Sequence, residues 1–241
     1  MSQSTAATSD AVKAETHIAI QAQNVTLSLG EGEARVDILK GIDLSIETGT
    51  TVALLGPSGS GKSSLMAILS GLERATGGTV NIAGADFGKM NEDELAVARR
   101  GRVGIVLQAF HLLPTMTAHE NVAVPLELDG SKDPFSVAAE ELSAVGLGDR
   151  LGHYPTQLSG GEQQRVAIAR AMASRPSIIF ADEPTGNLDG ATGEIIIELL
   201  FERQKATQAT LLMITHDPEL AKRCDRIIEL RDGLIERDSA T

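Results

Sequence analysis

The sequence has almost no cysteine and no long apolar run. Its single cysteine, Cys224, excludes a disulfide within the chain and favours a reducing compartment; we interpret it as a small side chain of the core. No apolar run approaches the roughly 20 residues that span a bilayer. The polar residues 1–15 also lack the apolar centre of a signal peptide. The composition therefore predicts a cytoplasmic globular protein, and any membrane component must be another chain.

Basic residues are also few. The chain has 21 Lys and Arg against 33 Asp and Glu, which gives a formal net charge of −12. Binding to nucleic acid without sequence preference needs a basic face that neutralises phosphates. The charge balance therefore argues against nucleic acid as a partner. With 241 residues, 42% of them hydrophobic, the chain is long enough to bury a sizeable core.

A G-x-x-x-x-G-K-S motif over residues 56–63 is the most informative feature present. It follows an apolar run over 51–55 and precedes a helix-like segment over 65–69. Glycines allow successive backbone N–H groups to surround phosphate oxygens at the positive end of a helix, and the lysine adds a charge toward the β- and γ-phosphates. The serine after the lysine can offer its hydroxyl to Mg²⁺. A plain Gly/Ser turn that ends in a surface lysine is the disfavoured alternative. The predicted nucleotide-binding residues are Gly56, Pro57, Ser58, Gly59, Ser60, Gly61, Lys62, Ser63 and Ser64.

Two adjacent acids end a second apolar run, over residues 178–181. Successive side chains of a strand point to opposite faces, so Asp182 and Glu183 are predicted to have different roles. Asp182 fits a Mg²⁺ partner of Ser63, whether direct or through water. Glu183 is placed to orient and deprotonate a water that attacks the γ-phosphate. Such a pair is a weak signal alone and a strong one beside the phosphate-binding loop.

Residues 158–165, Leu-Ser-Gly-Gly-Glu-Gln-Gln-Arg, predict a second helix start that could hold phosphate. This string resembles the signature motif of ABC-type ATPases, and residues 17–238 follow the motif order of that family. The resemblance implies a head-to-tail homodimer in which each signature closes over the ATP in the partner's phosphate-binding loop. A plain helix cap is the alternative for the motif. The residues predicted to contact ATP here are Ser159, Gly160, Gly161, Glu162 and Gln163.

Three further positions match the family's functional residues. Gln108 matches the glutamine that senses Mg²⁺ and the attacking water, so it joins Ser63 and Asp182 in the predicted metal set. His216 matches the histidine that contacts the γ-phosphate and supports the base. Asp189 matches the acid that communicates across the dimer. Taken singly, these residues would be a surface amide, a loop histidine and a helix cap.

The predicted fold is α/β: a P-loop NTPase of the ABC ATPase type, with a RecA-like parallel-sheet core, an antiparallel β subdomain and an inserted helical subdomain. We expect a tail over 1–16 and an ATPase domain over 17–238, with its core at 17–107 and 166–238 and its helical subdomain at 108–165. Pro114, Pro125, Pro134 and Pro155 are expected to break the helical part into short pieces. The predicted antiparallel strands are 17–22, 25–29, 42–46 and 79–82, and the later parallel strands are 103–107, 177–181 and 211–215.

The sequence departs from the family at the adenine site. The family usually stacks adenine on an aromatic near the end of the second strand, but no Phe, Tyr or Trp precedes Phe87. We therefore expect Leu29 or a neighbouring aliphatic side chain to cover the base, with weaker discrimination between ATP and GTP.

Residues 110–114 and 182–189 resemble the branch of lipoprotein-releasing (LolD-like) and macrolide-efflux (MacB-like) ATPases. Within that branch, the string over 158–165 and the missing aromatic resemble the YbbA-like group most. The resemblance implies a Mg²⁺-dependent ATPase on the cytoplasmic face of the inner membrane. It would power a separate permease that moves a hydrophobic lipid, lipoprotein, peptide or drug and docks near Gln108 and residues 110–124. That stretch could equally be core of the helical subdomain. A soluble ABC ATPase acting as a nucleotide-gated clamp is the alternative function, and a P-loop kinase would have no use for residues 158–165.

Overall fold

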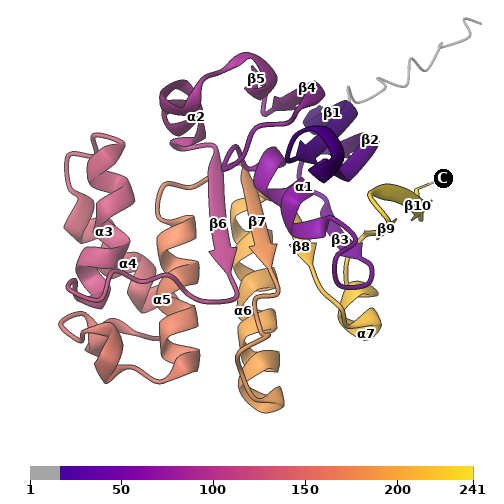
Figure 1. Cartoon of the computed structure of the whole chain (residues 1–241). Coiled ribbons are helices and arrows are strands. Elements are labelled where there is room, and N and C mark those ends of the chain that lie inside the picture. Colours follow the sequence, from indigo (N-terminus) through magenta and orange to yellow (C-terminus); the bar gives the residue numbers. More distant parts are fainter. Residues whose placement is uncertain (1–16, 241) are drawn as a thin grey trace, which may run out of the picture.

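The computed structural model describes residues 17–240, and the predicted tail over 1–16 lies outside them. One of its sheets is four-stranded, in the order β2-β1-β4-β5, with every neighbouring pair antiparallel (Figure 1). This sheet confirms the predicted antiparallel part. Its strands are β1 (Ile18–Leu29), β2 (Val36–Glu47), β4 (Gly77–Ile82) and β5 (Ala85–Asp86).

The strands predicted over 17–22 and 25–29 form one strand, β1, instead of two. The register against β2 shifts between Ala22 and Val25, and Asn24 between them has a left-handed φ of 48°. Its backbone N–H donates to Asp43 Oδ1 at 2.8 Å. A bulge of this kind interrupts the alternation of side chains without ending the strand, which explains why the sequence pattern breaks there.

The second sheet has six strands in the order β10-β9-β3-β8-β7-β6. All neighbouring pairs are parallel except β9 and β10, which form an antiparallel hairpin. The predicted parallel core is confirmed: β6 has the expected bounds, and β7 and β8 differ from the prediction by one residue at each end. The strands are β3 (Thr51–Leu55), β6 (Val103–Leu107), β7 (Ile178–Asp182), β8 (Thr210–Ile214), β9 (Arg226–Arg231) and β10 (Leu234–Asp238).

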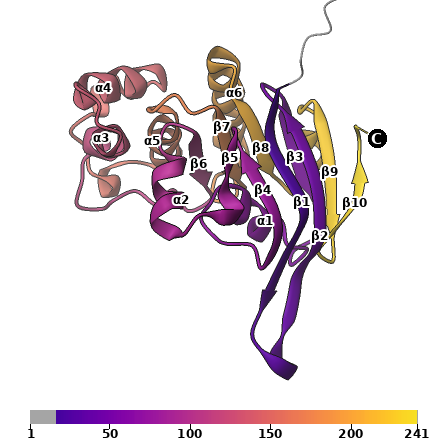
Figure 2. The same ribbon diagram turned by 90° about the horizontal axis from the view of Figure 1, so that it is seen from above.

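Helices cover both faces of this sheet, and those between β6 and β7 extend to one side of it (Figure 2). Within residues 17–240, no helix combines the length and apolarity that crossing a bilayer requires. The α-helices are α1 (Lys62–Leu69), α2 (Glu92–Arg99), α3 (Ala118–Leu128), α4 (Pro134–Ala144), α5 (Gly160–Met172), α6 (Gly190–Thr207) and α7 (Pro218–Ala221). Short 3-10 helices lie at Gly32–Ala34, Phe87–Lys89, Gly148–Arg150 and Pro155–Gln157.

One proline does not act as the sequence predicts. Pro125 lies inside α3 and does not break it. Thr117 and Glu120 form a capping box at the start of this helix, and its face around Val122 and Leu126 is buried. Capping and packing therefore outweigh the one helical hydrogen bond that proline removes.

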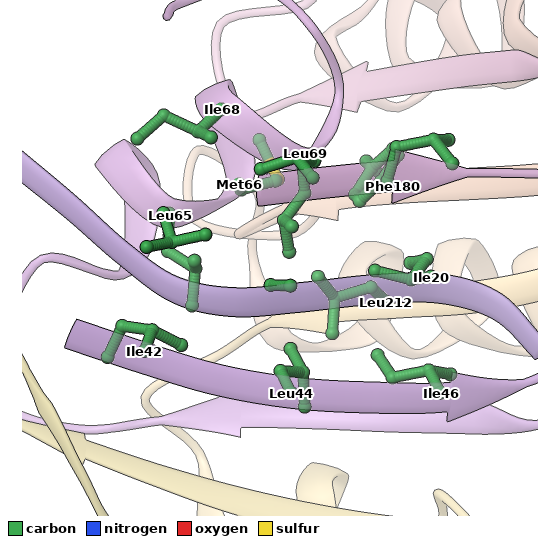
Figure 3. Close-up of a cluster of buried hydrophobic side chains, with 14 of the residues drawn as sticks. Ile20, Ile42, Leu44, Ile46, Leu65, Met66, Ile68, Leu69, Phe180 and Leu212 are labelled. Carbon is green, nitrogen blue, oxygen red and sulfur yellow. The ribbon is translucent and has the colours of Figure 1, made fainter. Parts of the chain in front are cut away.

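Two apolar cores lie on opposite faces of the six-stranded sheet, because successive strand residues alternate between faces. From β7, Phe180 belongs to the core shared with α1 and the four-stranded sheet, while Ile179 faces the other core. In Figure 3, Leu65, Met66, Ile68 and Leu69 of α1 lie among side chains from both sheets. Helix α1 is thereby fixed between the sheets, and its first residues are held at the edge where β3 ends.

Cys224 is half-buried at the margin of the second core. Burial raises the pKa of its thiol to about 11, and the charge of Asp225 adds to the effect. A thiol with so high a pKa is a poor nucleophile at neutral pH, in agreement with the interpretation of this cysteine as a packing residue.

Candidate active site

The loop between β3 and α1 has the geometry of a phosphate cradle. Gly61 stands at the N-cap of α1 with φ 98°, and Gly56 has φ 147°. A Cβ on Gly56 would lie 2.1 Å from the Leu230 carbonyl oxygen, so no side chain fits there. Glycine at the N-cap also cannot bond the first N–H groups of α1, which leaves these donors for a ligand.

Lys62 closes this loop with its side chain. The lysine is 8% exposed, and its Nζ donates to the carbonyl oxygens of Gly56 and Pro57, each at 2.9 Å. The ammonium is therefore held at the mouth of the loop, where the β- and γ-phosphates of a nucleotide are predicted to lie. Ser60, within the loop, is 2% exposed.

A cavity of about 480 Å³ joins this loop to residues far away in the sequence. Glu183 and His216, predicted to be catalytic, line it together with most of the phosphate-binding loop. The Nδ1 atom of His216 lies 3.4 Å from Glu183 Oε2. The lining residues are Ile38, Gly56, Ser58, Gly59, Gly61, Lys62, Ser63, Ser64, Glu183 and His216. One cavity thus unites a triphosphate cradle with a carboxylate and an imidazole.

Asp182 lies beside Ser63, as predicted for a shared Mg²⁺ site. Burial raises the pKa of the Asp182 carboxyl, and the charge of Glu183 adds to this, while a hydrogen bond from Ser63 and the charge of Lys62 oppose it. Among residues 17–240 there is no group of three or more His, Cys, Asp and Glu side chains that could enclose a metal. Mg²⁺ commonly takes one or two carboxylates and completes its shell with phosphates and waters. The pair of Ser63 and Asp182 fits that pattern.

Gln108 follows β6 at the same edge of the sheet. Leu107 pairs with Asp182 in the register of β6 and β7, so Gln108 follows β6 beside the end of β7. Its side chain lies against Gly186, where a Cβ would come within 2.5 Å of Gln108 Nε2. Gln108 is exposed and does not line the nucleotide cavity. Its predicted role at the metal stays a prediction.

The signature residues lie away from this cavity. Ser159 is the N-cap of α5 and forms a capping box with Glu162, whose pKa is lowered first by the Ser159 backbone N–H and then by its hydroxyl. Gln163 Nε2 donates to the Leu158 carbonyl oxygen at 3.0 Å. Ser159, Gly160, Gly161, Glu162 and Gln163 do not line the cavity that contains Lys62. A single chain therefore does not bring its own signature to its own phosphate-binding loop.

Asp189 also acts locally in this structure. It is the N-cap of α6, where Oδ1 accepts from Thr192 N at 3.0 Å and Oδ2 accepts from the Thr192 hydroxyl at 2.7 Å. The hydroxyl and backbone of Thr192 lower the pKa of the Asp189 carboxyl. These contacts match the alternative interpretation of Asp189 as a helix cap. Asp189 lines a separate cavity of about 410 Å³.

Sequence reasoning missed two residues of α5. Arg170 donates to the carbonyl oxygens of His111 at 2.7 Å and Phe110 at 2.9 Å, and both of these residues have left-handed φ angles. Gln164 donates to the Pro184 carbonyl oxygen, next to Glu183. Gln164 lies within the motif over 158–165, which does not show which of its side chains point inward, and Arg170 lies beyond the motif. Ile38, rather than Leu29, lines the nucleotide cavity.

Comparison with known proteins agrees with this geometry. The model of the ABC transporter family matches residues 39–186, more than half of the chain. The chain is an ABC transporter ATP-binding protein. This ATP-binding protein therefore has the family's ABC ATPase fold and its activity, ATP hydrolysis.

Its relatives include several named ABC proteins. The "Uncharacterized ABC transporter ATP-binding protein YbbA" of Escherichia coli K12 is 46% identical over 91% of this chain and 97% of its own length. LolD of Legionella pneumophila, named a lipoprotein-releasing system ATP-binding protein, is 45% identical over 90% of this chain and 96% of its own. The macrolide export ATP-binding/permease protein MacB of Marinobacter nauticus is 47% identical, over 91% of this chain but 34% of its own.

Among solved structures, the ATP-binding cassette MJ0796 matches with a TM-score of 0.84 and 41% identity. The match covers 91% of this chain and 97% of that one. That structure is described as a dimer in a post-hydrolysis state with ADP and Pi bound. The predicted resemblance to the ABC ATPases is therefore confirmed, as is its placement near YbbA, LolD and MacB.

Proposed function

We propose that this ATPase subunit powers a separate membrane permease that moves or extracts a hydrophobic cargo, such as a lipid, lipoprotein, peptide or drug. The observation that carries the proposal is the cavity in which Lys62, Glu183 and His216 meet, since it supplies the ATPase part of such a machine. The relative LolD is named for a lipoprotein-releasing system and the relative MacB for macrolide export, which supports a hydrophobic cargo.

The proposed mechanism assigns each side chain a role at the triphosphate. The N–H groups at the start of α1 and the Lys62 ammonium bind the phosphates. Bound Mg²⁺ would neutralise charge on the β- and γ-phosphates, with Ser63, Asp182 and Gln108 as its protein partners. Glu183 orients and deprotonates the attacking water, and His216, 3.4 Å away, supports that carboxylate and reaches toward the γ-phosphate.

We propose that two copies enclose two nucleotides. The start of α5 presents Ser159 and two glycines but lies outside the chain's own nucleotide cavity. A head-to-tail dimer would bring these residues to the partner's ATP, and a single two-fold axis would create both sites. The MJ0796 structures, described as dimeric, support this arrangement.

The permease is proposed to dock near Gln108 and residues 110–124, which would place the dimer on the cytoplasmic face of the inner membrane. The chain turns here through two consecutive left-handed residues, Phe110 and His111. The guanidinium of Arg170 holds both of their carbonyl oxygens. Movement of this turn would therefore act directly on α5, the helix that begins with the signature.

Leu113 offers a test of this docking surface. Its side chain is 42% exposed within 110–124, and we expect Leu113→Asp to abolish co-purification of the tagged chain with a detergent-solubilised permease encoded beside it. Leu128→Asp is the matched control, because Leu128 is 60% exposed on α3 and lies outside the stretch. If both variants co-purified equal amounts of the permease, the proposed docking site would be refuted. If the unmodified chain captures only soluble proteins, the clamp alternative replaces transport.

Ile38 lines the nucleotide cavity, so we further expect Ile38→Tyr to strengthen ATP binding by about tenfold, since stacking of a base on an aromatic side chain contributes roughly 1–3 kcal/mol. The gain should be smaller for GTP if the ring restores discrimination between bases. Nucleotide titration by fluorescence would measure both dissociation constants. Leu72→Tyr is the control, because Leu72 is 51% exposed and does not line the cavity. Unchanged affinity in Ile38→Tyr would mean that this position does not cover the base.

A further inference from the structure

The backbone at Glu183 has an unusual conformation. Glu183 has φ 42°, in the left-handed region, although it is not a glycine. Such residues persist only where their surroundings hold them, and they cluster at functional sites. Two backbone hydrogen bonds help: Glu183 N donates to the Ile214 carbonyl oxygen at 3.1 Å, and Gly186 N donates to the Glu183 carbonyl oxygen at 3.0 Å.

The backbone of Pro184 is held by a hydrogen bond from outside its own turn. Proline has no backbone N–H, so a hydrogen bond can hold it only through its carbonyl oxygen. The residue is buried, and its carbonyl oxygen accepts from Gln164 Nε2 at 2.7 Å. Because the carbonyl can only accept, the orientation of the Gln164 amide is determined by this bond.

Gln164 is costly for stability. It is 0% exposed, and among the described residues its Oε1 atom has no hydrogen-bond partner. A buried polar atom without a partner destabilises the folded state, whereas an apolar side chain of similar size would avoid that cost. An amide at this place is therefore better explained by what it holds than by packing.

We propose that Gln164 is a positioning residue, which holds Pro184 through its hydrogen bond and thereby keeps the Glu183 carboxylate aligned in the nucleotide cavity. Gln164 lies on α5, one helical turn after Gly160. The same bond therefore ties the position of Glu183 to the start of the signature helix. The inference rests on the proposed role of Glu183 as the base.

The test is the ATPase activity of Gln164→Leu in the full chain. We expect kcat to fall by about tenfold or more, since small displacements of a catalytic group have large effects on rate. The KM for ATP should stay within about twofold, because Gln164 does not line the nucleotide cavity. Gln164→Met also removes the donor while keeping an unbranched side chain, so it must give the same result and replaces the leucine variant if that fails to fold.

Gln204→Leu is a closely matched control. Gln204 is 7% exposed on α6, and its Nε2 also donates to a backbone carbonyl oxygen, that of Ala209, at 2.7 Å. Each substitution leaves a buried backbone carbonyl oxygen without its side-chain donor, but only the change at Gln164 should lower kcat. An equal fall in kcat for both would show general damage and would overturn the inference, as would an unchanged kcat for Gln164→Leu.

A double variant separates positioning from structural loss. In a Glu183→Gln background, Gln164→Leu should still bind ATP and form the same nucleotide-trapped dimer as Glu183→Gln alone. Loss of that dimer would mean that Gln164 supports the fold rather than the base. If Glu183→Gln itself hydrolyses ATP at the normal rate, the proposed function of Glu183 fails instead, and the two failures are distinguished.

Discussion

Glu183→Gln is expected to lower ATP turnover by about 10² or more while the chain still binds ATP. Glutamine keeps the shape of the side chain and can still hydrogen-bond, but it cannot accept a proton from the attacking water. Hydrolysis should stop before the γ-phosphate leaves, so an ATP-bound dimer should accumulate. Steady-state phosphate release and size-exclusion chromatography in ATP would measure both effects.

The matched control for this substitution is Glu127→Gln. Glu127 is exposed on α3 and does not line the nucleotide cavity, so turnover should be unchanged. Normal hydrolysis by Glu183→Gln would show that another group activates the water. If Glu183→Gln remained monomeric in saturating ATP, even with its permease present, the result would contradict the proposed nucleotide-enclosing dimer.

Ser159→Arg is expected to spare ATP binding by the monomer but to prevent dimer closure. The arginine side chain would occupy the space at the start of α5 where the partner's phosphates are proposed to bind. Turnover should fall by about 10², the scale seen when one donor to a developing charge is removed. Combined with Glu183→Gln, the arginine should abolish the ATP-dependent dimer in the same chromatographic assay.

Ser159→Ala separates blocking from loss of the helix cap. In the structure the Ser159 hydroxyl accepts from Glu162 N at 3.3 Å and donates to Glu162 Oε2 at 2.9 Å. Removing such a cap costs about 1 kcal/mol of stability. Alanine should therefore lower the melting temperature slightly and still permit dimer formation. If Ser159→Ala and Ser159→Arg abolish the dimer equally, dimer closure requires the capping box at Ser159 and not only free space at the start of α5.

Much of the candidate site was predictable because its parts are local. The Gly56–Ser63 spacing specifies a loop and a helix start within one short segment. Asp182 and Glu183 are adjacent, so the end of β7 places both at the same sheet edge. The cap at Ser159 likewise depends on Glu162, only three residues away. In each case the geometry follows from backbone rules that act over a few residues.

Other parts of the site depend on pairs that sequence spacing does not determine. Gln164 and Pro184 are 20 residues apart, and Arg170 lies 59 residues from His111. Periodicity identifies α5 as a helix but does not tell which neighbour each buried polar side chain meets. The same limit explains why Ile38, rather than Leu29, lines the nucleotide cavity.

Short-range patterns of glycine, apolar and charged residues were enough to predict the fold class, the phosphate-binding loop, the paired acids and the signature helix. Local patterns did not predict that β1 continues through a bulge at Asn24 or that α3 continues through Pro125, because both depend on packing. Packing also brought Gln164 to Pro184 and Arg170 to Phe110 and His111. These outcomes depend on packing between segments that are distant in the sequence. The free energy of that packing exceeds the local conformational preferences of the residues, and it arises only when the sheets and helices come together.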